Sequence, residues 1–287
     1  MSAPDERLAR VGCVIVNYNA GRWLARCIET LRPPGRTAPA IVVVDNGSGD
    51  GSLDGMDPDR VRIDRAGRNL GFAAGVNRGA AGLDTEYLLV LNPDARIDPD
   101  ALAALAAELD AHPDAALAGG RVVGLDGCEQ RASRRRLPTP GRICREMLPF
   151  AANGIDLSQM PPPDGPVDAE AVSGACMLLR RRAFDAVGGM DDGFPLHFED
   201  LDLFARLQQA GWRLRWTPAA TIEHAGGRST RSRPVAVMWA KHVGLWRYLR
   251  RHGGSAWPRW QRPLWLLLLT AHALVRTPVA WIRRRAA

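Results

Sequence analysis

The sequence predicts an α/β fold with a doubly wound, mostly parallel sheet, followed by a basic helical tail. Short β-rich runs alternate with helical patterns through the first half of the chain, as in sheets whose strands are connected by helices. Continuous apolar runs such as "IVVVD" and "YLLVLNPD" are typical of strands that are covered on both faces. We expect strands at Gly12–Val16, Ile41–Val44, Val61–Ile63, Tyr87–Leu91 and Ala116–Val123, and helices at Arg22–Leu31, Phe72–Leu83 and Pro99–Ala111.

The composition is that of a globular protein. The 287 residues are 46% hydrophobic and 24% charged, and they suffice for one domain with an appendage. The apolar run Val11–Val16 is too short for a signal peptide and indicates a buried strand instead. The cysteines form no CxxC pair, so neither a zinc site nor a disulfide framework is indicated. We therefore expect a protein of the reducing cytosol.

Polar side chains follow three of the predicted strands. They are Asn17 and Asn19 after the first strand, Asp45, Asn46 and Ser48 after the second, and Asn92 and Asp94 after the strand that ends at Leu91. Any one of these groups alone would indicate a turn, because Asn, Asp and Ser favour turns. Ligands of open α/β sheets bind beyond the carboxyl ends of the strands. Together the three groups predict one concave binding site.

The segment "GRNLGFAAGVNRGAAG" carries glycines at 67, 71, 75, 79 and 82. Small residues four apart let a helix lie close to a sheet. A glycine-rich helix entry also lets backbone N–H groups approach a phosphate or a sugar. The segment is not GxGxxG, and the chain contains no GxxxxGK[ST] motif, so dinucleotide-binding and P-loop functions are disfavoured.

A metal site is predicted around Asp94 in "NPDA". Mg²⁺ or Mn²⁺ needs only one or two carboxylates when the phosphates of a nucleotide diphosphate supply other ligands. His224 in "TIEHAGGRST" precedes two glycines, Arg228 and two hydroxyl residues, which together offer donors to an anion. We expect His224 or Arg228 to reach the phosphate or the metal beside Asp94. The alternative is that neither residue binds a ligand, so that Asp94 is an ordinary turn residue and His224 is an ordinary histidine at the end of a strand.

The stretch "HFEDLDLFARLQQAGW" begins a helix with three acids. Acids in a first helical turn complement the helix dipole. At about 100° per residue, Asp200 falls on the apolar face, Glu199 at its edge, and Asp202 away from it. A carboxylate on a buried face is costly unless a partner, a metal or a substrate proton meets it. Asp200 is therefore the first candidate for chemistry, and Asp202 is expected to be solvated.

Seven motifs in order carry a resemblance to a known family: "VIVNYN", "VVVDNGS", "RNLGFAAGVNRG", "LNPDA", "VSGACMLLRRRAFDAVGGMDDGF", "FEDLDLFARLQQAGW" and "EHAGGRST". Together they resemble the family 2 inverting glycosyltransferases, which have the Rossmann-like GT-A fold. The likeness is greatest to the bacterial rhamnosyltransferase-like branch. It covers about Val11 to Thr230 and implies a hexosyltransferase that takes a nucleotide sugar as its donor.

On the donor side, the resemblance implies that Asp45 binds the nucleoside. Asn69 and Asn77 match positions that line the donor pocket. Asn17, Asn19, Asn92 and Arg228 are also assigned to donor binding, from their places at the strand ends and in the glycine turn.

On the catalytic side, Asp94 matches the last acid of the family's DxD metal motif, although Asn92 stands where the first aspartate would be. The expected cofactor is a divalent cation, Mg²⁺ or Mn²⁺, bound by Asp94 and His224. Asp200 matches the aspartate of the "ED" motif, the general base, with Glu199 beside it. The segment Ser173–Cys176 resembles the acceptor-side strand. The implied reaction is in-line attack by an acceptor hydroxyl, with inversion and without a covalent intermediate.

The tail is strongly basic. After Asp202 the only acid is Glu223, whereas the same segment holds fifteen arginines and Lys241. Such a block predicts an anionic partner. The apolar run Leu264–Val275 would form about 18 Å of helix, too little to cross a hydrocarbon core of about 30 Å. We expect a helix that lies in the plane of an anionic membrane surface. A tilted or re-entrant segment is the other arrangement that this length allows.

Tryptophans beside many arginines match a membrane-interface composition; they are Trp239, Trp246, Trp257, Trp260, Trp265 and Trp281. A helical appendage packed on the catalytic domain is the alternative. Membrane binding favours a polyprenyl-diphosphate-linked saccharide as the acceptor, with another glycan as the wider possibility. Similar bacterial enzymes use dTDP-L-rhamnose as the donor. The expected location is peripheral, on the inner face of the cytoplasmic membrane, in cell-envelope synthesis.

We expect a catalytic domain at residues 1–233, with a nucleotide-sugar half at about 11–124 and an acceptor half at 125–233, and a tail at 234–287. Three other functions compete with this one. A nucleotidyltransferase shares the sheet and the metal-binding aspartate but does not explain the acidic helix start. A nucleic-acid-binding protein would account for the charge, yet no recognition motif accompanies it. The third is a non-catalytic sugar-nucleotide binder.

Overall fold

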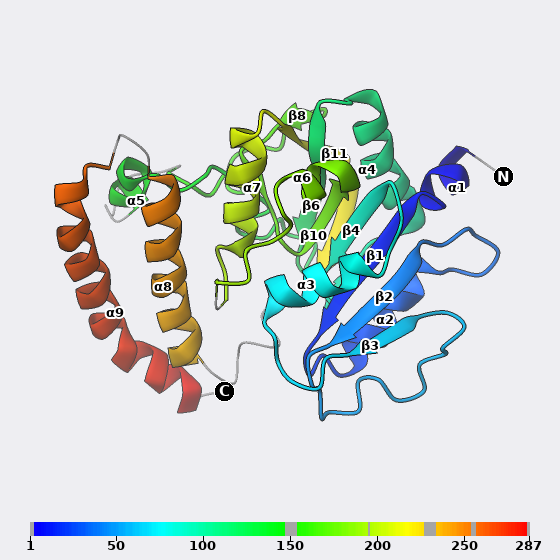
Figure 1. Cartoon of the computed structure of the whole chain (residues 1–287), viewed down its shortest axis with the longest axis horizontal. Helices are drawn as coiled ribbons and strands as arrows, with labels where there is room; N and C mark the ends of the chain where they lie inside the picture. Colours follow the sequence, from blue (N-terminus) through cyan, green and yellow to red (C-terminus); the bar gives the residue numbers. More distant parts are fainter. Residues whose placement is uncertain (1–2, 147–153, 195, 227–233, 254–256, 286–287) are drawn as a thin grey trace.

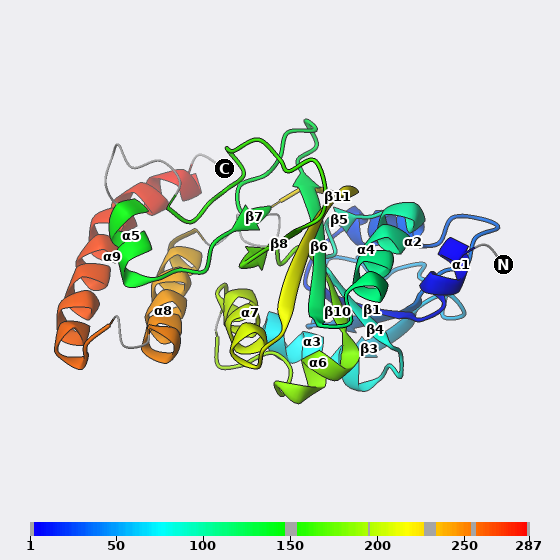
Figure 2. The ribbon, with the colours of Figure 1, turned by 90° about the horizontal axis from the view of Figure 1, so that it is seen from above.

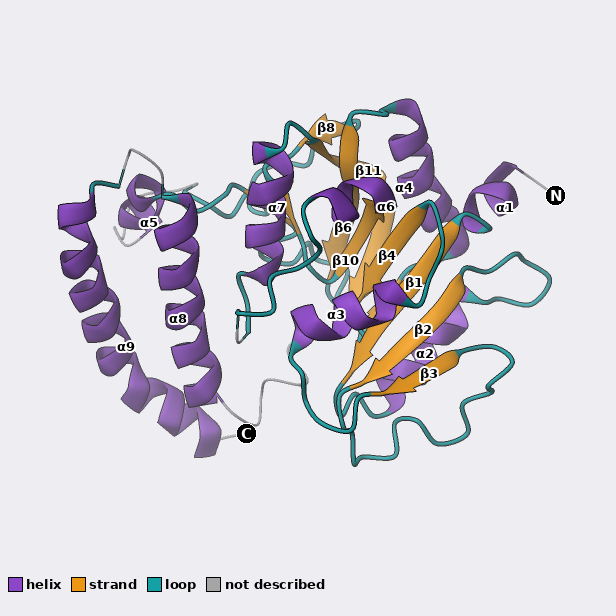
Figure 3. Cartoon of the chain, viewed as in Figure 1, coloured by secondary structure: helices purple, strands orange, loops and turns teal. Residues whose placement is uncertain are grey.

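The computed structural model describes residues 3–146, 154–194, 196–226, 234–253 and 257–285, and a nine-stranded sheet lies at its centre (Figure 1, Figure 3). The strands of this sheet are β1 (Val11–Asn17), β2 (Ala40–Asp45), β3 (Arg62–Arg65), β4 (Tyr87–Leu91), β5 (Ala95–Arg96), β6 (Ala115–Val123), β8 (Val167–Asp168), β10 (Cys176–Arg180) and β11 (Arg213–His224). A separate ribbon pairs β7 (Arg134–Arg135) with β9 (Ala171–Val172).

The helices surround this sheet and continue into the tail. They are α1 (Ala3–Leu8), α2 (Arg22–Leu31), α3 (Phe72–Ala81), α4 (Pro99–Ala111), α5 (Pro140–Glu146), α6 (Arg181–Ala186), α7 (Glu199–Gln209), α8 (Pro234–His252), the 3₁₀ turn η1 (Arg259–Gln261) and α9 (Arg262–Arg285). All the strands and helices predicted from the sequence are present, and α2, α4 and β4 have the predicted bounds.

The sheet is mostly parallel, as predicted. Its strand order is β3-β2-β1-β4-β10-β6-β11-β5, with β8 also paired to β11. Strand β10 is antiparallel to both β4 and β6, so β6 runs in the same direction as β4 and as its own parallel partner β11. Strands β1, β2 and β4 therefore end at one edge, where Asn17 lies beside Asp45.

Helices cover both faces of the sheet (Figure 2). Alternate residues of β1 enter two different cores: Val14 and Val16 pack with α3, α6 and α7, and Cys13 and Ile15 pack with α1, α2 and α4. A Cβ on Gly79 would lie 2.5 Å from Val14, and one on Gly75 would lie 2.8 Å from Val16. The glycine-rich segment thus lets α3 approach the sheet closely, which confirms the packing interpretation of these two glycines.

The tail forms a helical pair beside the sheet domain, with α8 next to α7 and α9 next to α8 (Figure 1). Its tryptophans divide in a way the sequence did not predict. Trp257 and Trp265 are buried and meet edge to face, with ring centroids 6.5 Å apart, so the interfacial placement was wrong for these two. They fill the junction between the helices, whereas Trp260 and Trp281 are exposed. No helix in the described part of the chain is long and apolar enough to cross a membrane.

Candidate active site

Asn17 and Asp45 meet at the carboxyl edge of the sheet because β1 and β2 pair in parallel register. Both are buried, and Asn17 Nδ2 donates to Asp45 Oδ1 at 3.1 Å and to Ser52 Oγ at 2.9 Å. The Ser48 amide lies 3.3 Å from each carboxylate oxygen of Asp45. Among the described residues, the buried Asn17 Oδ1 has no partner. The corner is therefore a preorganised cluster of buried polar groups, and sequence reasoning missed Ser52.

The other predicted donor-side asparagines hold the loops of this edge. Asn19 has a left-handed backbone (φ 52°), and its Oδ1 accepts from the Gly49 amide at 2.9 Å. Asn69 is exposed, and its Oδ1 accepts from the Gly71 amide at 2.9 Å. Asn69 thus shapes the glycine turn that enters α3.

Asn77 has a different environment from the one expected for a donor-pocket residue. Its Nδ2 donates to the Met190 carbonyl at 2.8 Å, and its Oδ1 accepts from the Met190 amide at 2.9 Å. Both ends of the side chain are thus committed to the backbone of the loop between α6 and α7. In this structure Asn77 joins α3 to that loop.

Asp94 and His224 come together, as predicted for the metal site. Strands β5 and β11 place His224 opposite Ala95, and His224 Nε2 lies 3.2 Å from Asp94 Oδ1. Gln130 fixes the imidazole: its Nε2 donates to the His224 carbonyl at 2.6 Å, so its Oε1 accepts from His224 Nδ1 at 2.9 Å. A metal-binding histidine commonly donates its second ring nitrogen in this way. The pair therefore fits a divalent cation.

The remaining ligands would come from outside the protein. Within the described ranges, no three His, Cys, Asp or Glu side chains gather as a metal cluster. Phosphate and water oxygens would complete the shell of a cation at Asp94, as is usual for Mg²⁺ sites. The backbone amide of Asn92 donates to the Ala175 carbonyl at 2.9 Å. Arg228 lies outside the described residues.

The acidic start of α7 faces the strand ends. Asp200 Oδ2 accepts from Arg135 Nη2 at 2.5 Å, and Arg135 also donates to the Val172 carbonyl at 2.8 Å. A Cβ on Gly174 would lie 2.9 Å from Asp200 Oδ2. Because the next residue, Ala175, is bonded to Asn92, the segment Ser173–Ala175 connects Asp200 with the "NPDA" turn. Sequence reasoning missed Arg135 and Gln130, which belong to the long connection between β6 and β10.

Glu199, the residue before Asp200, is a buried acid. It is 8% exposed, and its Oε2 has no partner among the described residues. Burial, aided by the charge of Asp200, raises the pKa of the Glu199 carboxyl well above its usual range. Burial also lowers the pKa of the neighbouring His197 to about 4. The site therefore combines a carboxyl that retains its proton with an uncharged imidazole near neutral pH.

The raised pKa of Glu199 makes stability fall as pH increases. Below its ordinary pKa of 4.5, Glu199 is protonated in both the folded and the unfolded chain. Above it, the unfolded chain releases the proton first, so stability declines until pH passes the raised value in the folded chain. Glu199→Gln removes this loss. We expect its melting temperature to exceed that of the wild type at about pH 8 but not at about pH 4. Equal differences at both pH values, or the same behaviour in the exposed Glu29→Gln control, would contradict the assignment.

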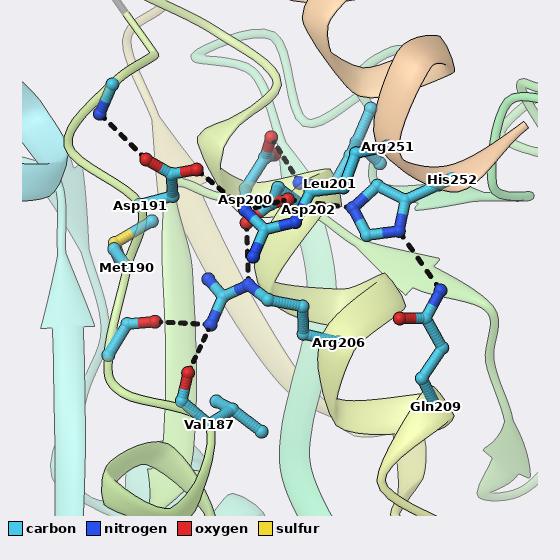
Figure 4. Close-up of polar contacts among 12 residues, drawn as sticks. Val187, Met190, Asp191, Asp200, Leu201, Asp202, Arg206, Gln209, Arg251 and His252 are labelled. Atoms are coloured by element: carbon cyan, nitrogen blue, oxygen red, sulfur yellow. Dashed lines mark hydrogen bonds and ion pairs between the residues drawn. The ribbon is translucent and has the colours of Figure 1, made fainter.

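Asp202 is not solvated, contrary to the expectation from the helical wheel. Its side chain is 0% exposed and accepts from Arg206 Nε and from His252 Nε2, each at 2.7 Å (Figure 4). Burial alone would raise the pKa of Asp202, but these hydrogen bonds hold it below its usual range. The wheel located the face that packs on the sheet, where Leu203, Phe204 and Leu207 are buried. The helical wheel could not show that α8 covers another face of α7, the one that carries Asp202.

Comparisons with known proteins agree with this architecture. The family model described as Glycosyl transferase family 2 matches residues 13–188. The N-acetylglucosaminyl-diphospho-decaprenol L-rhamnosyltransferase of Mycobacterium tuberculosis is 30% identical to the chain, over 95% of each of the two proteins.

Solved structures share the fold. The mannosyltransferase PcManGT from Pyrobaculum calidifontis, in complex with GDP-Man and Mn²⁺, matches with a TM-score of 0.58 and 16% identity, over 96% of this chain and 73% of that one. The crystal structure of GalNAc-T7 with UDP, GalNAc and Mn²⁺ matches with a TM-score of 0.57 and 18% identity, over 77% of this chain and 44% of that one.

Proposed function

The chain belongs to glycosyl transferase family 2, and we propose that it transfers L-rhamnose from dTDP-L-rhamnose to a saccharide on a polyprenyl diphosphate. The proposed mechanism rests on one observation: a single segment contacts both the predicted metal-binding turn and the predicted general base. In the segment Ser173–Ala175, the Ala175 carbonyl accepts a hydrogen bond from the backbone amide of Asn92 in the "NPDA" turn. Gly174 of the same segment lies against Asp200 at the start of α7. The likeness to the mycobacterial rhamnosyltransferase supports the choice of donor and acceptor.

The donor is proposed to bind along the carboxyl edge of the sheet. Asp45 and Asn17 are assigned to the nucleoside, because the hydrogen bond between them already holds their polar groups in place. Asp94 and His224 hold a divalent cation, Mg²⁺ or Mn²⁺. When bound, this cation neutralises the negative charge that develops on the departing diphosphate.

Asp200 is the proposed general base. It takes the proton from the acceptor hydroxyl while the hydroxyl oxygen bonds to the anomeric carbon of the sugar. The bond from that carbon to the nucleoside diphosphate breaks on the opposite side, so the configuration inverts. A positioned base contributes roughly 10²–10⁴-fold to such a step. Arg135 holds Asp200 in place through its 2.5 Å contact.

The acceptor is proposed to approach from the Arg135 side of Asp200. A cleft of about 260 Å³ opens there, and its wall includes Arg135, Glu170 and Trp216. Charged groups such as Arg135 and Glu170 can bind the hydroxyl groups of a sugar through hydrogen bonds.

A transfer assay tests the proposed function. The full chain is incubated with dTDP-L-rhamnose, Mn²⁺ and detergent-dispersed polyprenyl-diphosphate N-acetylglucosamine. We expect release of dTDP together with a rhamnosylated lipid. In a parallel reaction with dTTP and a sugar 1-phosphate, formation of a nucleotide sugar with release of pyrophosphate would identify a nucleotidyltransferase instead. Donor binding without any turnover would identify a non-catalytic sugar-nucleotide binder.

The tail is proposed to attach the protein to the inner face of the cytoplasmic membrane. Helix α9 packs on α8 through buried Trp265, Leu269 and Ala273. Another face of α9 carries an exposed apolar stripe with helical spacing; it consists of Leu264, Leu267, Leu268, Leu274 and Val275. The arginines of the tail supply attraction to anionic lipid headgroups. An apolar stripe on a basic helix is typical of helices that lie in the membrane interface.

Leu267→Glu is expected to weaken membrane binding about tenfold or more, because burying a leucine contributes roughly 1.5–3 kcal/mol. Flotation with liposomes that contain anionic phospholipid measures the bound fraction. Leu266→Glu is the matched control, because this side chain is exposed on a different face of the same helix. Equal losses in the two variants, or no loss in either, would remove the stripe as the membrane contact.

A further inference from the structure

We propose that helix α8 of the tail is a positioning element of the active site, which holds the first turn of α7 so that the Asp200 carboxylate stays where the acceptor hydroxyl arrives. The inference rests on the proposed function, because it takes Asp200 as the general base. It gives the tail a second role, separate from membrane attachment. Contacts at three places carry it.

The first contacts involve the two residues before α7. His197 and Phe198 have φ values of 63° and 71°, a left-handed conformation that residues with side chains keep only where their surroundings enforce it. Helix α8 supplies those surroundings. A Cβ on Gly244 would lie 2.9 Å from the His197 carbonyl oxygen and 3.0 Å from Phe198 Cδ2. The ring of Phe198 also packs against Tyr248, with centroids 6.1 Å apart. The backbone that leads into Glu199 and Asp200 is therefore confined by α8.

The second contacts lie within the first turn of α7. Asp202 Oδ1 accepts from His252 Nε2 at 2.7 Å and pairs with Arg251 Nη1 at 3.2 Å, and both partners belong to α8 (Figure 4). Gln209 Nε2 lies 3.1 Å from His252 Nδ1 and fixes the imidazole ring from the other side. A buried carboxylate that loses its partners is strongly destabilising. Helix α8 therefore cannot move away from α7 without leaving the charge of Asp202 poorly paired.

The third contacts hold the loop that precedes α7. Asp191 accepts from Arg247 Nη2 at 3.0 Å and from Arg251 Nη1 at 2.7 Å. Arg251 thus joins this loop to Asp202 of α7 (Figure 4). The adjacent residue, Met190, is held by Asn77 of α3. The loop is therefore fixed from α3 on one side and from α8 on the other.

Gly244→Ala tests the role of α8 without weakening the helix itself. Alanine favours a helix over glycine, but its methyl group would displace His197 and Phe198. A misplacement of about 1 Å costs on the order of 10²-fold in rate. We expect kcat for the detergent-dispersed acceptor to fall about 10- to 100-fold, with an unchanged donor Kd and a protein that is still folded at the assay temperature. Val243→Ala, at the exposed neighbouring position, is the control and should keep the wild-type kcat.

Arg251→Met keeps the test decisive if Gly244→Ala does not fold. The Arg251 side chain is 45% exposed, so its replacement leaves the core intact. We expect a lower kcat with an unchanged donor Kd. Arg250→Met removes the same charge one position away and is the matched control. A general loss of tail charge would affect both arginine variants equally, whereas a positioning role affects only Arg251→Met.

The inference is overturned if Arg251→Met has the same kcat as Arg250→Met. It is also overturned if Gly244→Ala folds and has the same kcat as Val243→Ala. It is also overturned if donor binding falls together with kcat. Asp200→Asn, measured in the same assay, separates this failure from that of the proposed function. If Asp200→Asn is inactive while the α8 variants are fully active, only the role of α8 is wrong. If Asp200→Asn is itself active, the assignment of the base fails.

Discussion

Asp200→Asn is expected to slow sugar transfer by roughly 10²–10⁴-fold, which is the contribution of a positioned general base. Asparagine has nearly the same shape, so it preserves the close contact with Gly174 and still offers an oxygen to Arg135. It cannot accept the proton of the acceptor hydroxyl. Donor affinity should change little, because the residues assigned to the nucleoside lie at the ends of other elements. Initial rates and donor titrations measure the two quantities.

The control for this variant is Asp192→Asn, an exposed acid in the loop before the same helix. It removes one negative charge from the same region and should keep the wild-type rate. Thermal unfolding of Asp200→Asn shows whether the variant is folded. A folded Asp200→Asn protein with wild-type turnover would remove Asp200 as the base.

Asp94→Asn is expected to lower transfer on the order of 10²–10³-fold, the loss typical of removing one group that stabilises developing charge. The variant should also lose the Mn²⁺-dependent part of its donor binding. Thermal shift with dTDP-L-rhamnose, measured with and without Mn²⁺, detects this directly, because a ligand stabilises the folded state by mass action. Asp100→Asn, at an exposed acid in the first turn of α4, is the control.

Gln130→Leu extends the metal test to the residue that orients His224. Loss of such a partner typically lowers metal affinity 10–100-fold. We expect a weaker Mn²⁺ response in Gln130→Leu than in the wild type, with the Mn²⁺-free melting curve as the reference for folding. If Asp94→Asn and Gln130→Leu keep the full Mn²⁺ response, the cation does not bind at Asp94 and His224.

The main strands and helices could be predicted because they carry long, regular patterns. The runs that became β1, β2 and β4 are apolar throughout, since helices pack on both faces of the sheet. Strands β5, β7, β8 and β9 have two residues each and are too short for any periodic signal. The antiparallel direction of β10 also lay beyond the sequence pattern, because pairing direction depends on the path of the whole chain.

The candidate site was predictable where it depends on strand ends. Parallel strands bring their carboxyl ends to one edge, so Asn17 and Asp45 were expected to meet, and they do. Gln130 and Arg135 were missed because they come from the long connection between β6 and β10, in which the strand of Arg135 has only two residues, and because they reach partners 94 and 65 residues away. No local pattern encodes a contact of that kind.

The errors at α7 and in the tail have one physical cause. A helical wheel shows which side chains are apolar, but not which other helix covers a polar face. Asp202 was assigned to solvent because α8, which buries it, begins 32 residues later in the chain. Trp257 and Trp265 were assigned to a membrane interface because the sequence alone does not reveal how α8 and α9 pack.

The anomeric configuration of the product is the most direct test of the proposed mechanism. Wild-type protein is given dTDP-L-rhamnose and the lipid-linked acceptor, and the new glycosidic bond is analysed by NMR. Direct attack by a hydroxyl that Asp200 deprotonates predicts a configuration opposite to that of the donor. A product with the donor's own configuration would contradict this account, because the sugar would then have been attacked twice or from the side of the leaving group.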